Sequence, residues 1–119
     1  MRIIFCGTSR YAPAFREKIT EVLFTLNPSN TTIIHGGCPG VDKMVDAEAR
    51  KCGFPIEVFP ADWKTYGGAA GPIRNKEMLN SGADKVYAFP YSSLEKSVCT
   101  KNMVTQARKV GVPVVILQK

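Results

Sequence analysis

The chain has 119 residues, 45% of them hydrophobic, and its 16 basic and 10 acidic side chains give a formal net charge of +6. This length fits one compact domain with a sizeable core, and the composition is that of a soluble globular protein. No apolar run approaches the ~20 residues of a membrane helix, so we expect no membrane-embedded protein. The N-terminus carries no signal-peptide pattern.

The first half of the chain alternates apolar, β-branched runs with amphipathic patterns. We predict strands at residues 2–6, 31–35 and 56–59, and helices at residues 13–26 and 41–52. Pro13 suits a first helical turn, and Gly53 is placed to end the second helix. The third strand alternates apolar and polar residues, which indicates an exposed edge of the sheet.

The second half begins with a glycine- and alanine-rich linker at residues 60–71, which has no core pattern of its own. Long irregular segments in small domains are usually functional. We then predict helices at residues 72–79 and 98–110 and strands at residues 85–90 and 112–117. Between them, residues 91–97 form a polar loop that contains three serines.

This alternation with short connections predicts a single Rossmann-like α/β/α domain over residues 1–119. Its five-stranded parallel sheet has the expected order 3-2-1-4-5 with right-handed crossovers. In that order the topological switch lies between the first and fourth strands, where ligands bind beyond the carboxyl ends. The loops at residues 7–10, 36–42 and 91–100 therefore gather at one rim, and residues 60–75 can fold over it.

The run from Thr32 to Asp42 places two adjacent glycines between a strand and a helix. Glycine lets the backbone approach a ligand closely, and the helix that follows presents unpaired N–H groups to an anion. The loop matches neither the dinucleotide fingerprint nor a P-loop, so we expect no resident cofactor. The four cysteines lie far apart without zinc spacing, which predicts free thiols, no metal site and a cytoplasmic location.

Four motifs resemble the SLOG superfamily, which joins the DprA/Smf DNA-processing proteins and the Lonely-guy phosphoribohydrolases. They are Gly7-Thr8-Ser9-Arg10, His35-Gly36-Gly37-x-x-Gly40-x-Asp42, Pro60-Ala61-Asp62-Trp63 and Ala69-Ala70-Gly71-Pro72-Ile73-Arg74-Asn75. The chain looks most like the small YspA-like, YpsA-related branch, and the resemblance runs from Arg2 to Leu117.

The resemblance implies a Rossmann-like domain that binds nucleotides or nucleotide-derived ligands. Carried over by position, the ligand-facing residues are Gly7, Ser9 and Arg10 in the first loop, Gly36, Gly37, Gly40 and Asp42 in the second, Arg74 and Asn75 on the third helix, and Thr100 on the fourth.

The chain departs from the superfamily's enzymes after the fourth strand. Those enzymes share a Pro-Gly-Gly-x-Gly-Thr-x-x-Glu motif at this point, whereas this chain has Pro90, a serine-rich loop and Thr100. With Thr100 in the place of the threonine, Met103 occupies the position of the catalytic glutamate. A methionine supplies no charge or proton, which speaks against Lonely-guy-type cleavage. The phosphate cradle must then be rebuilt from serine hydroxyls, or it is lost.

Several side chains have two interpretations. Arg10 either binds a phosphate through its guanidinium fork or is a surface arginine. Asp42 either accepts a hydrogen bond from a ribose hydroxyl or caps the glycine loop locally. Asp62 is a candidate catalytic acid, as is Asp42, or else a turn residue. Trp63 and Tyr66 either stack on a base or pack the linker onto the domain.

Three functions remain open at this point. The first, which we favour, is a sensor or ligand-binding module for a molecule with phosphate and ribose. The second is a nucleotide-processing hydrolase, N-glycosidase-like, in which Asp62 or Asp42 replaces the glutamate. The third is a DprA-like nucleic-acid binder, motivated by the net charge of +6 but weakened by the scatter of the basic residues. We expect no membrane partner, and analogy with related folds allows a homodimer.

Overall fold

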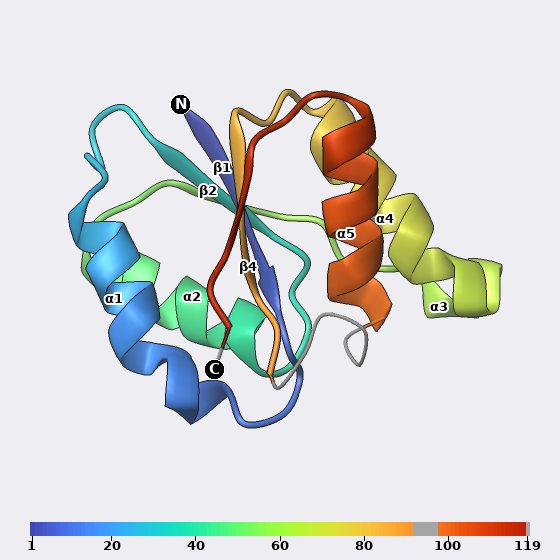
Figure 1. Cartoon of the computed structure of the whole chain (residues 1–119), viewed down its shortest axis with the longest axis horizontal. Coiled ribbons are helices and arrows are strands. Elements are labelled where there is room, and N and C mark those ends of the chain that lie inside the picture. Colours follow the sequence, from blue (N-terminus) through green and yellow to red (C-terminus); the bar gives the residue numbers. More distant parts are fainter. Residues whose placement is uncertain (92–97, 119) are drawn as a thin grey trace.

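The computed structural model describes residues 1–91 and 98–118. In this part of the chain, five parallel strands form one sheet in the order β3-β2-β1-β4-β5 (Figure 1). The strands are β1 (Arg2–Gly7), β2 (Thr32–His35), β3 (Ile56–Val58), β4 (Lys85–Phe89) and β5 (Val114–Ile116). The predicted order is confirmed, and β3 lies at an edge as its alternating sequence indicated.

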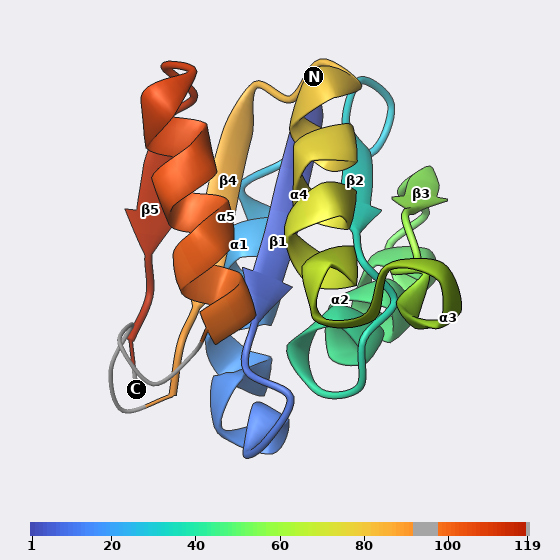
Figure 2. The same cartoon turned by 90° about the vertical axis from the view of Figure 1, so that its right-hand side faces the viewer.

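Helices cover both faces of the sheet, which confirms the three-layer prediction (Figure 1). The 3-10 helix η1 (Ala12–Phe15), α1 (Arg16–Phe24) and α2 (Val41–Lys51) pack on one face. The opposite face is covered by α4 (Ala70–Asn80) and α5 (Val98–Lys109) (Figure 2). None of the described helices has the length and hydrophobicity that crossing a membrane requires.

The central strand divides its side chains between two hydrophobic cores. Ile3 and Phe5 of β1 face the core beneath α1 and α2, while Ile4 and Cys6 face the core beneath α4 and α5. Because both faces of β1 are buried, its sequence is a continuous apolar run rather than an alternating one. The β1 register joins Ile4 to Ile34 on one side and to Val86 on the other, so both neighbours hold it.

The segment after β3 is more regular than its glycine content predicted. The short helix α3 (Trp63–Tyr66) and the 3-10 helix η2 (Gly67–Ala69) fill most of it, on the side of the sheet that β3 occupies (Figure 2). Asp62 caps α3, since its Oδ1 accepts a hydrogen bond from the Thr65 N–H at 3.1 Å. The following helix begins at Ala70, two residues before the predicted start, so Pro72 still lies in its first turn, and Ala70 is buried in the domain.

Candidate functional site

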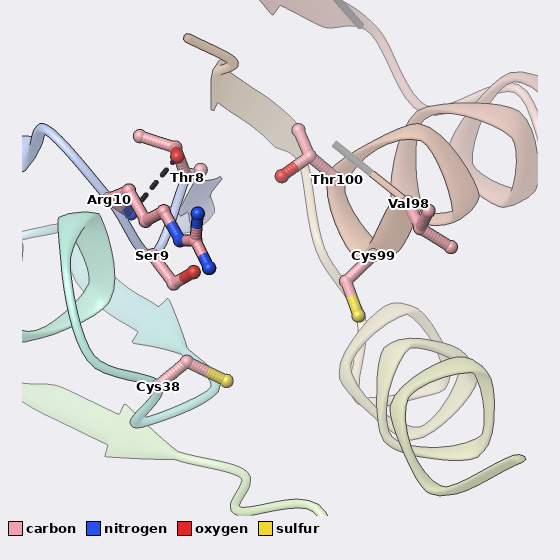
Figure 3. Close-up of a pocket in the computed structure, with 8 residues that line it drawn as sticks. Thr8, Ser9, Arg10, Cys38, Val98, Cys99 and Thr100 are labelled. Carbon is pink, nitrogen blue, oxygen red and sulfur yellow. Dashed lines mark hydrogen bonds between the residues drawn. The ribbon is translucent and has the colours of Figure 1, made fainter. Parts of the chain in front are cut away.

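A cavity of about 360 Å³ opens at the carboxyl end of the sheet (Figure 3). The loop after β1 and the glycine loop form one wall, and the first turn of α5 forms the other. The described lining consists of Gly7, Thr8, Ser9, Arg10, Cys38, Val98, Cys99 and Thr100. The chain leaves β1 toward one face and β4 toward the opposite face, so the cavity lies at the predicted switch point.

Thr8 holds the loop after β1 in place. Its N–H donates to the Phe89 carbonyl at 3.1 Å, its carbonyl accepts from the Val41 N–H at 3.0 Å, and its hydroxyl accepts from the Arg10 N–H at 3.1 Å. These bonds join β1, β4 and the start of α2. Ser9 and Arg10 remain exposed at the cavity (Figure 3), and the Arg10 guanidinium has no hydrogen bond or ion pair with any residue that the structure describes.

Glycines let the two loops of this wall pack against each other. A Cβ on Gly40, whose φ is +92°, would overlap the Thr8 carbonyl oxygen and lie 2.6 Å from the Ser9 Cα. A Cβ on Gly7 would lie 2.8 Å from the Phe89 carbonyl oxygen. At these two positions protein atoms fill the space beside the glycine, so their lack of a side chain serves to build the wall.

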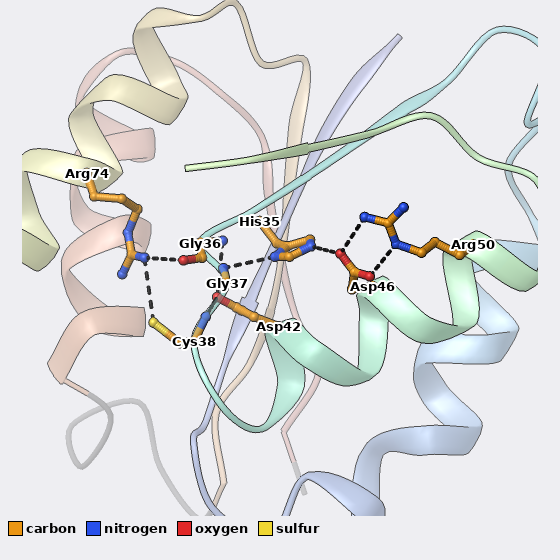
Figure 4. A network of polar contacts seen from close by, with 8 residues as sticks. All are labelled: His35, Gly36, Gly37, Cys38, Asp42, Asp46, Arg50 and Arg74. Carbon is orange, nitrogen blue, oxygen red and sulfur yellow. Dashed lines mark hydrogen bonds and ion pairs between the residues drawn. The ribbon is translucent and has the colours of Figure 1, made fainter. Parts of the chain in front are cut away.

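Asp42 holds the glycine loop from inside (Figure 4). Its side chain is buried, and its Oδ2 accepts from the N–H groups of Gly36 at 3.1 Å and Cys38 at 3.3 Å. This geometry matches the local-cap interpretation of Asp42. Burial raises the pKa of the Asp42 carboxyl above its usual value, and the loop N–H groups and the buried Arg74 guanidinium oppose that rise.

His35 joins the end of β2 to α2. Its Nδ1 accepts from the Gly37 N–H at 2.9 Å and must therefore be unprotonated, so Nε2 donates to Asp46 Oδ2 at 2.7 Å (Figure 4). Asp46 also accepts from Arg50 at 2.6 Å, and this Arg50 bond is the main cause that lowers the pKa of the Asp46 carboxyl. His35 is thus a buried structural residue of the loop.

Arg74 reaches from α4 to the glycine loop, although it is only 4% exposed. Its Nη1 donates to the Gly36 carbonyl at 3.1 Å and lies 3.6 Å from the Cys38 Sγ (Figure 4). Gly36 permits this approach, because a Cβ there would lie 2.6 Å from the Arg74 Cζ. Within the described ranges, Arg74 has no ion-pair partner and its Nη2 has no hydrogen bond.

A second, smaller cavity of about 30 Å³ lies beside this guanidinium. Asp42, Arg74, Cys99 and Thr100 are among the described residues that line it. A buried charge without an ion-pair partner is costly unless its hydrogen bonds are satisfied. The Arg74 Nη2 is therefore available to donate to an anionic group or a water molecule in the part of the site that α4 forms.

Asn75 positions the first turn of α5 rather than facing the larger cavity. Its Oδ1 accepts from Arg74 Nε at 3.0 Å, and its Nδ2 donates to the Cys99 carbonyl and to Asn102 Oδ1, each at 3.2 Å. Both amide hydrogens are thereby used. This contact places Thr100, whose hydroxyl points toward the cavity (Figure 3). Met103, one turn further along, is fully buried in the core and is not among the described residues that line the two cavities.

Some residues predicted from the sequence lie elsewhere. Asp62 is exposed and caps α3, while Trp63 and Tyr66 are about half exposed on α3, and none of the three lines either cavity. The serine loop at residues 92–97 lies outside the described residues, so the rebuilt phosphate cradle stays a prediction. All four cysteines are free, as predicted, and Cys38 and Cys99 line both cavities.

Sequence reasoning did not identify the aromatic pair of Tyr11 and Tyr91. Their rings stack with centroids 4.3 Å apart, and Tyr11 directly follows Arg10 of the cavity lining. The two residues come from loops far apart in the chain. Only the position of Tyr11 next to the Gly-Thr-Ser-Arg motif could have marked it as a residue of interest.

Comparisons with known proteins found a similar curated sequence and a solved structure of similar fold. The chain is 39% identical over 94 residues to the Gene 61 protein of Mycobacterium phage D29, an alignment that spans 75% of this chain and 73% of that protein. The X-ray structure of TM1055 superposes with a TM-score of 0.74 over 95% of this chain and 71% of that chain. At 19% identity the second match shows a common fold alone.

The family comparison agrees with three of the four motifs, since the motif at residues 69–75 lies beyond the matched range. The profile of the YAcAr family, described as the YspA, cpYpsA-related SLOG family, matches residues 1–66. That range contains the loop after β1 and the glycine loop, whereas Arg74 and Thr100 lie beyond it. With more than half of its length matched and its fold confirmed, the chain belongs to the YspA, cpYpsA-related SLOG family.

Proposed function

We propose that this protein binds a nucleotide-derived ligand, with phosphate and ribose, in the cavity between the loop after β1 and α5. The observation that carries the proposal is the Arg10 guanidinium, which lies at the cavity without a partner among the described residues. A guanidinium binds phosphate through two parallel N–H bonds. The first turn of α5 lines the same cavity, and the start of a helix favours anions.

Polar groups on both walls support a ligand that also carries hydroxyls. Thr8 and Ser9 on one wall and Thr100 on the other offer hydroxyls that donate or accept. The volume of about 360 Å³ falls within the roughly 300–1,000 Å³ of small-molecule sites. The SLOG family and the Rossmann-like fold are consistent with nucleotide-related ligands. The cavity lies at the carboxyl ends of the strands, where such folds bind them.

The described side chains favour binding over catalysis. Among the described residues that line the two cavities, Asp42 is the one carboxylate, and it already accepts two loop N–H bonds. Met103, at the position of the superfamily's glutamate, is buried in the core. We therefore infer a sensor or ligand-binding module as the role of the domain.

A thermal-shift screen followed by calorimetry tests the proposal. We expect AMP, GMP or ADP-ribose at millimolar concentration to raise the melting temperature, because a ligand that binds only the folded state stabilises it. Arg10→Gln should weaken binding by about tenfold or more, the order of one charged hydrogen bond. Arg108→Gln removes the same charge from an exposed site in the last turn of α5 and should leave binding unchanged.

Two results would contradict the proposal. One is the absence of stabilisation by any of these nucleotides, and the other is an equal loss of affinity in the Arg10 and Arg108 variants. Chromatography of the incubated nucleotides gives a separate readout. Release of free base or ribose phosphate would assign the domain to the hydrolase class instead of the ligand-binding class.

A further inference from the structure

The Tyr11–Tyr91 pair connects the two loops that border the switch point. Tyr11 belongs to the loop after β1, and Tyr91 follows the end of β4 by two residues. Their ring planes differ by 28° at a centroid distance of 4.3 Å, which is a stacked arrangement. The pair therefore lies beside Arg10, at the point where the chain leaves β1 and β4 toward opposite faces of the sheet.

Tyr11 remains 60% exposed although one side of its ring meets Tyr91. Tyr91 is half-buried and packs against the core beneath α1 and α2. The inner ring thus anchors the outer one, and the outer ring offers its remaining surface to solvent. A rigid aromatic surface of this kind provides contact area for a flat ligand without further ordering of the side chain.

The backbone of Tyr11 is held in an unfavourable conformation. Its φ of 60° and ψ of 24° make it the one described non-glycine residue with a positive φ. A bulky side chain rarely adopts this left-handed conformation, and such strain tends to occur at ligand sites. Thr8 holds the preceding turn by accepting the Arg10 N–H with its hydroxyl, and η1 begins at Ala12 just beyond, with Pro13 in its first turn.

We propose that Tyr11, supported by Tyr91, is the stacking surface for the base of the ligand whose phosphate binds at Arg10. This inference rests on the proposed function and narrows its ligand to an intact nucleotide. Every base has a π-face, so stacking binds nucleotides without selecting one base. A ribose phosphate without a base would occupy the phosphate position and leave Tyr11 uncovered.

Tyr11, Trp63 and Tyr66 all lie outside the described lining of the larger cavity, and position in the chain favours Tyr11. Trp63 and Tyr66 are also about half exposed, but both lie on α3, and neither is next in the chain to a residue of the described lining of the larger cavity. Tyr11, in contrast, is the next residue after Arg10.

Three variants separate the ring from the fold. Tyr11→Asn removes the ring while keeping a residue that tolerates a left-handed backbone, so folding is retained. Tyr11→Phe keeps the ring and removes the hydroxyl. Phe24→Asn removes an aromatic ring that is 75% exposed. It lies at the C-terminal end of α1, which points away from the loop after β1 (Figure 1), and serves as the matched control.

Calorimetry with AMP and with ribose 5-phosphate tests the inference. We expect the unsubstituted protein to bind AMP at least about fivefold more tightly than ribose 5-phosphate, the lower range of one base–aromatic stack. Tyr11→Asn should abolish this difference while leaving the affinity for ribose 5-phosphate unchanged. Tyr11→Phe and Phe24→Asn should both preserve it.

The outcomes distinguish the inference from the function on which it rests. Equal affinities for the two probes in the unsubstituted protein, or an AMP preference that survives Tyr11→Asn, would overturn the stacking role and leave the phosphate site standing. Binding of neither probe, together with no stabilisation by the nucleotide panel, would overturn both.

Discussion

Gly40 is the residue at which the two loops of the candidate site approach most closely. A side chain there would meet the backbone of Thr8 and Ser9, and the residue also has a positive φ. Gly82 has a similar φ of +98° but open space around it. The pair of glycines therefore separates the cost of the backbone conformation from the cost of the steric clash.

We expect Gly40→Ala to lower the free energy of unfolding by about 2–5 kcal/mol, the sum of about 1–2 kcal/mol for an alanine at a positive φ and about 1–3 kcal/mol for an overpacked contact. Gly82→Ala should cost only about 1–2 kcal/mol, from the backbone conformation alone. Urea unfolding of both variants measures the difference. Equal costs would show that the loop can move away from Thr8.

Asp42 gives a prediction about pH. Burial raises its folded-state pKa above the unfolded value of about 3.9. The stability that this group contributes is therefore fully present below the unfolded pKa and is lost as pH rises through the folded pKa. Asp42→Asn keeps an oxygen that can accept the loop N–H bonds but cannot ionise, so we expect it to gain stability relative to the unsubstituted protein as pH rises from about 4 toward neutral.

Urea midpoints across that pH range measure this effect. Asp62→Asn, which removes an exposed carboxylate that caps α3, is the control for a general change in surface charge. If Asp42→Asn instead loses stability relative to the unsubstituted protein as pH rises, attraction between Asp42 and the buried Arg74 outweighs the cost of burying the carboxylate.

At the scale of elements, a network of amide side chains connects α4 and α5. Asn75 connects Arg74, the Cys99 carbonyl and Asn102, and Gln106 extends the network by donating to Asn102 Oδ1 at 2.7 Å and to the Pro72 carbonyl at 3.1 Å. The start of α5 and the buried guanidinium are thus held by the same side chain.

Asn75→Ala should lower the free energy of unfolding by about 1–3 kcal/mol, because it leaves buried donors and acceptors without partners. Asn80→Ala, an exposed substitution in the same helix, should stay within about 0.5 kcal/mol of the unsubstituted protein. Chemical denaturation compares the two variants. A neutral effect of Asn75→Ala would mean that water replaces its bonds and that α5 is positioned by apolar packing.

At the scale of the whole molecule, the net charge of +6 predicts attraction to nucleic acid without specificity. Binding by scattered charge depends on counterion release, and six to ten phosphate contacts lose about 10³–10⁵ in affinity between roughly 50 and 200 mM salt. We therefore expect any binding of duplex DNA, followed by fluorescence anisotropy, to disappear over this range. DNA binding that persists at the higher salt would favour the nucleic-acid-binding alternative.

The amino-acid sequence by itself determined the order of the elements, the strand order and the end of the strands at which the cavity lies. Two-sided burial of β1 and the amphipathic helices follow from the hydrophobic pattern, and parallel strands with right-handed crossovers allow few arrangements. The helix that begins at Ala70 was predicted to begin at Pro72, because proline is common in a first helical turn, and here it is the third helical residue.

Tertiary structure alone decided what each side chain of the site does. Asp42 turns inward to the N–H groups of Gly36 and Cys38, Arg74 crosses to a carbonyl 38 residues away, and Tyr11 meets Tyr91. Periodicity predicts which face of an element is buried, but the direction of a polar side chain depends on which donors and acceptors the packed chain brings near it. For that reason the sequence located the cavity, while only the folded chain distinguished the residues that build its walls from those that remain free to bind.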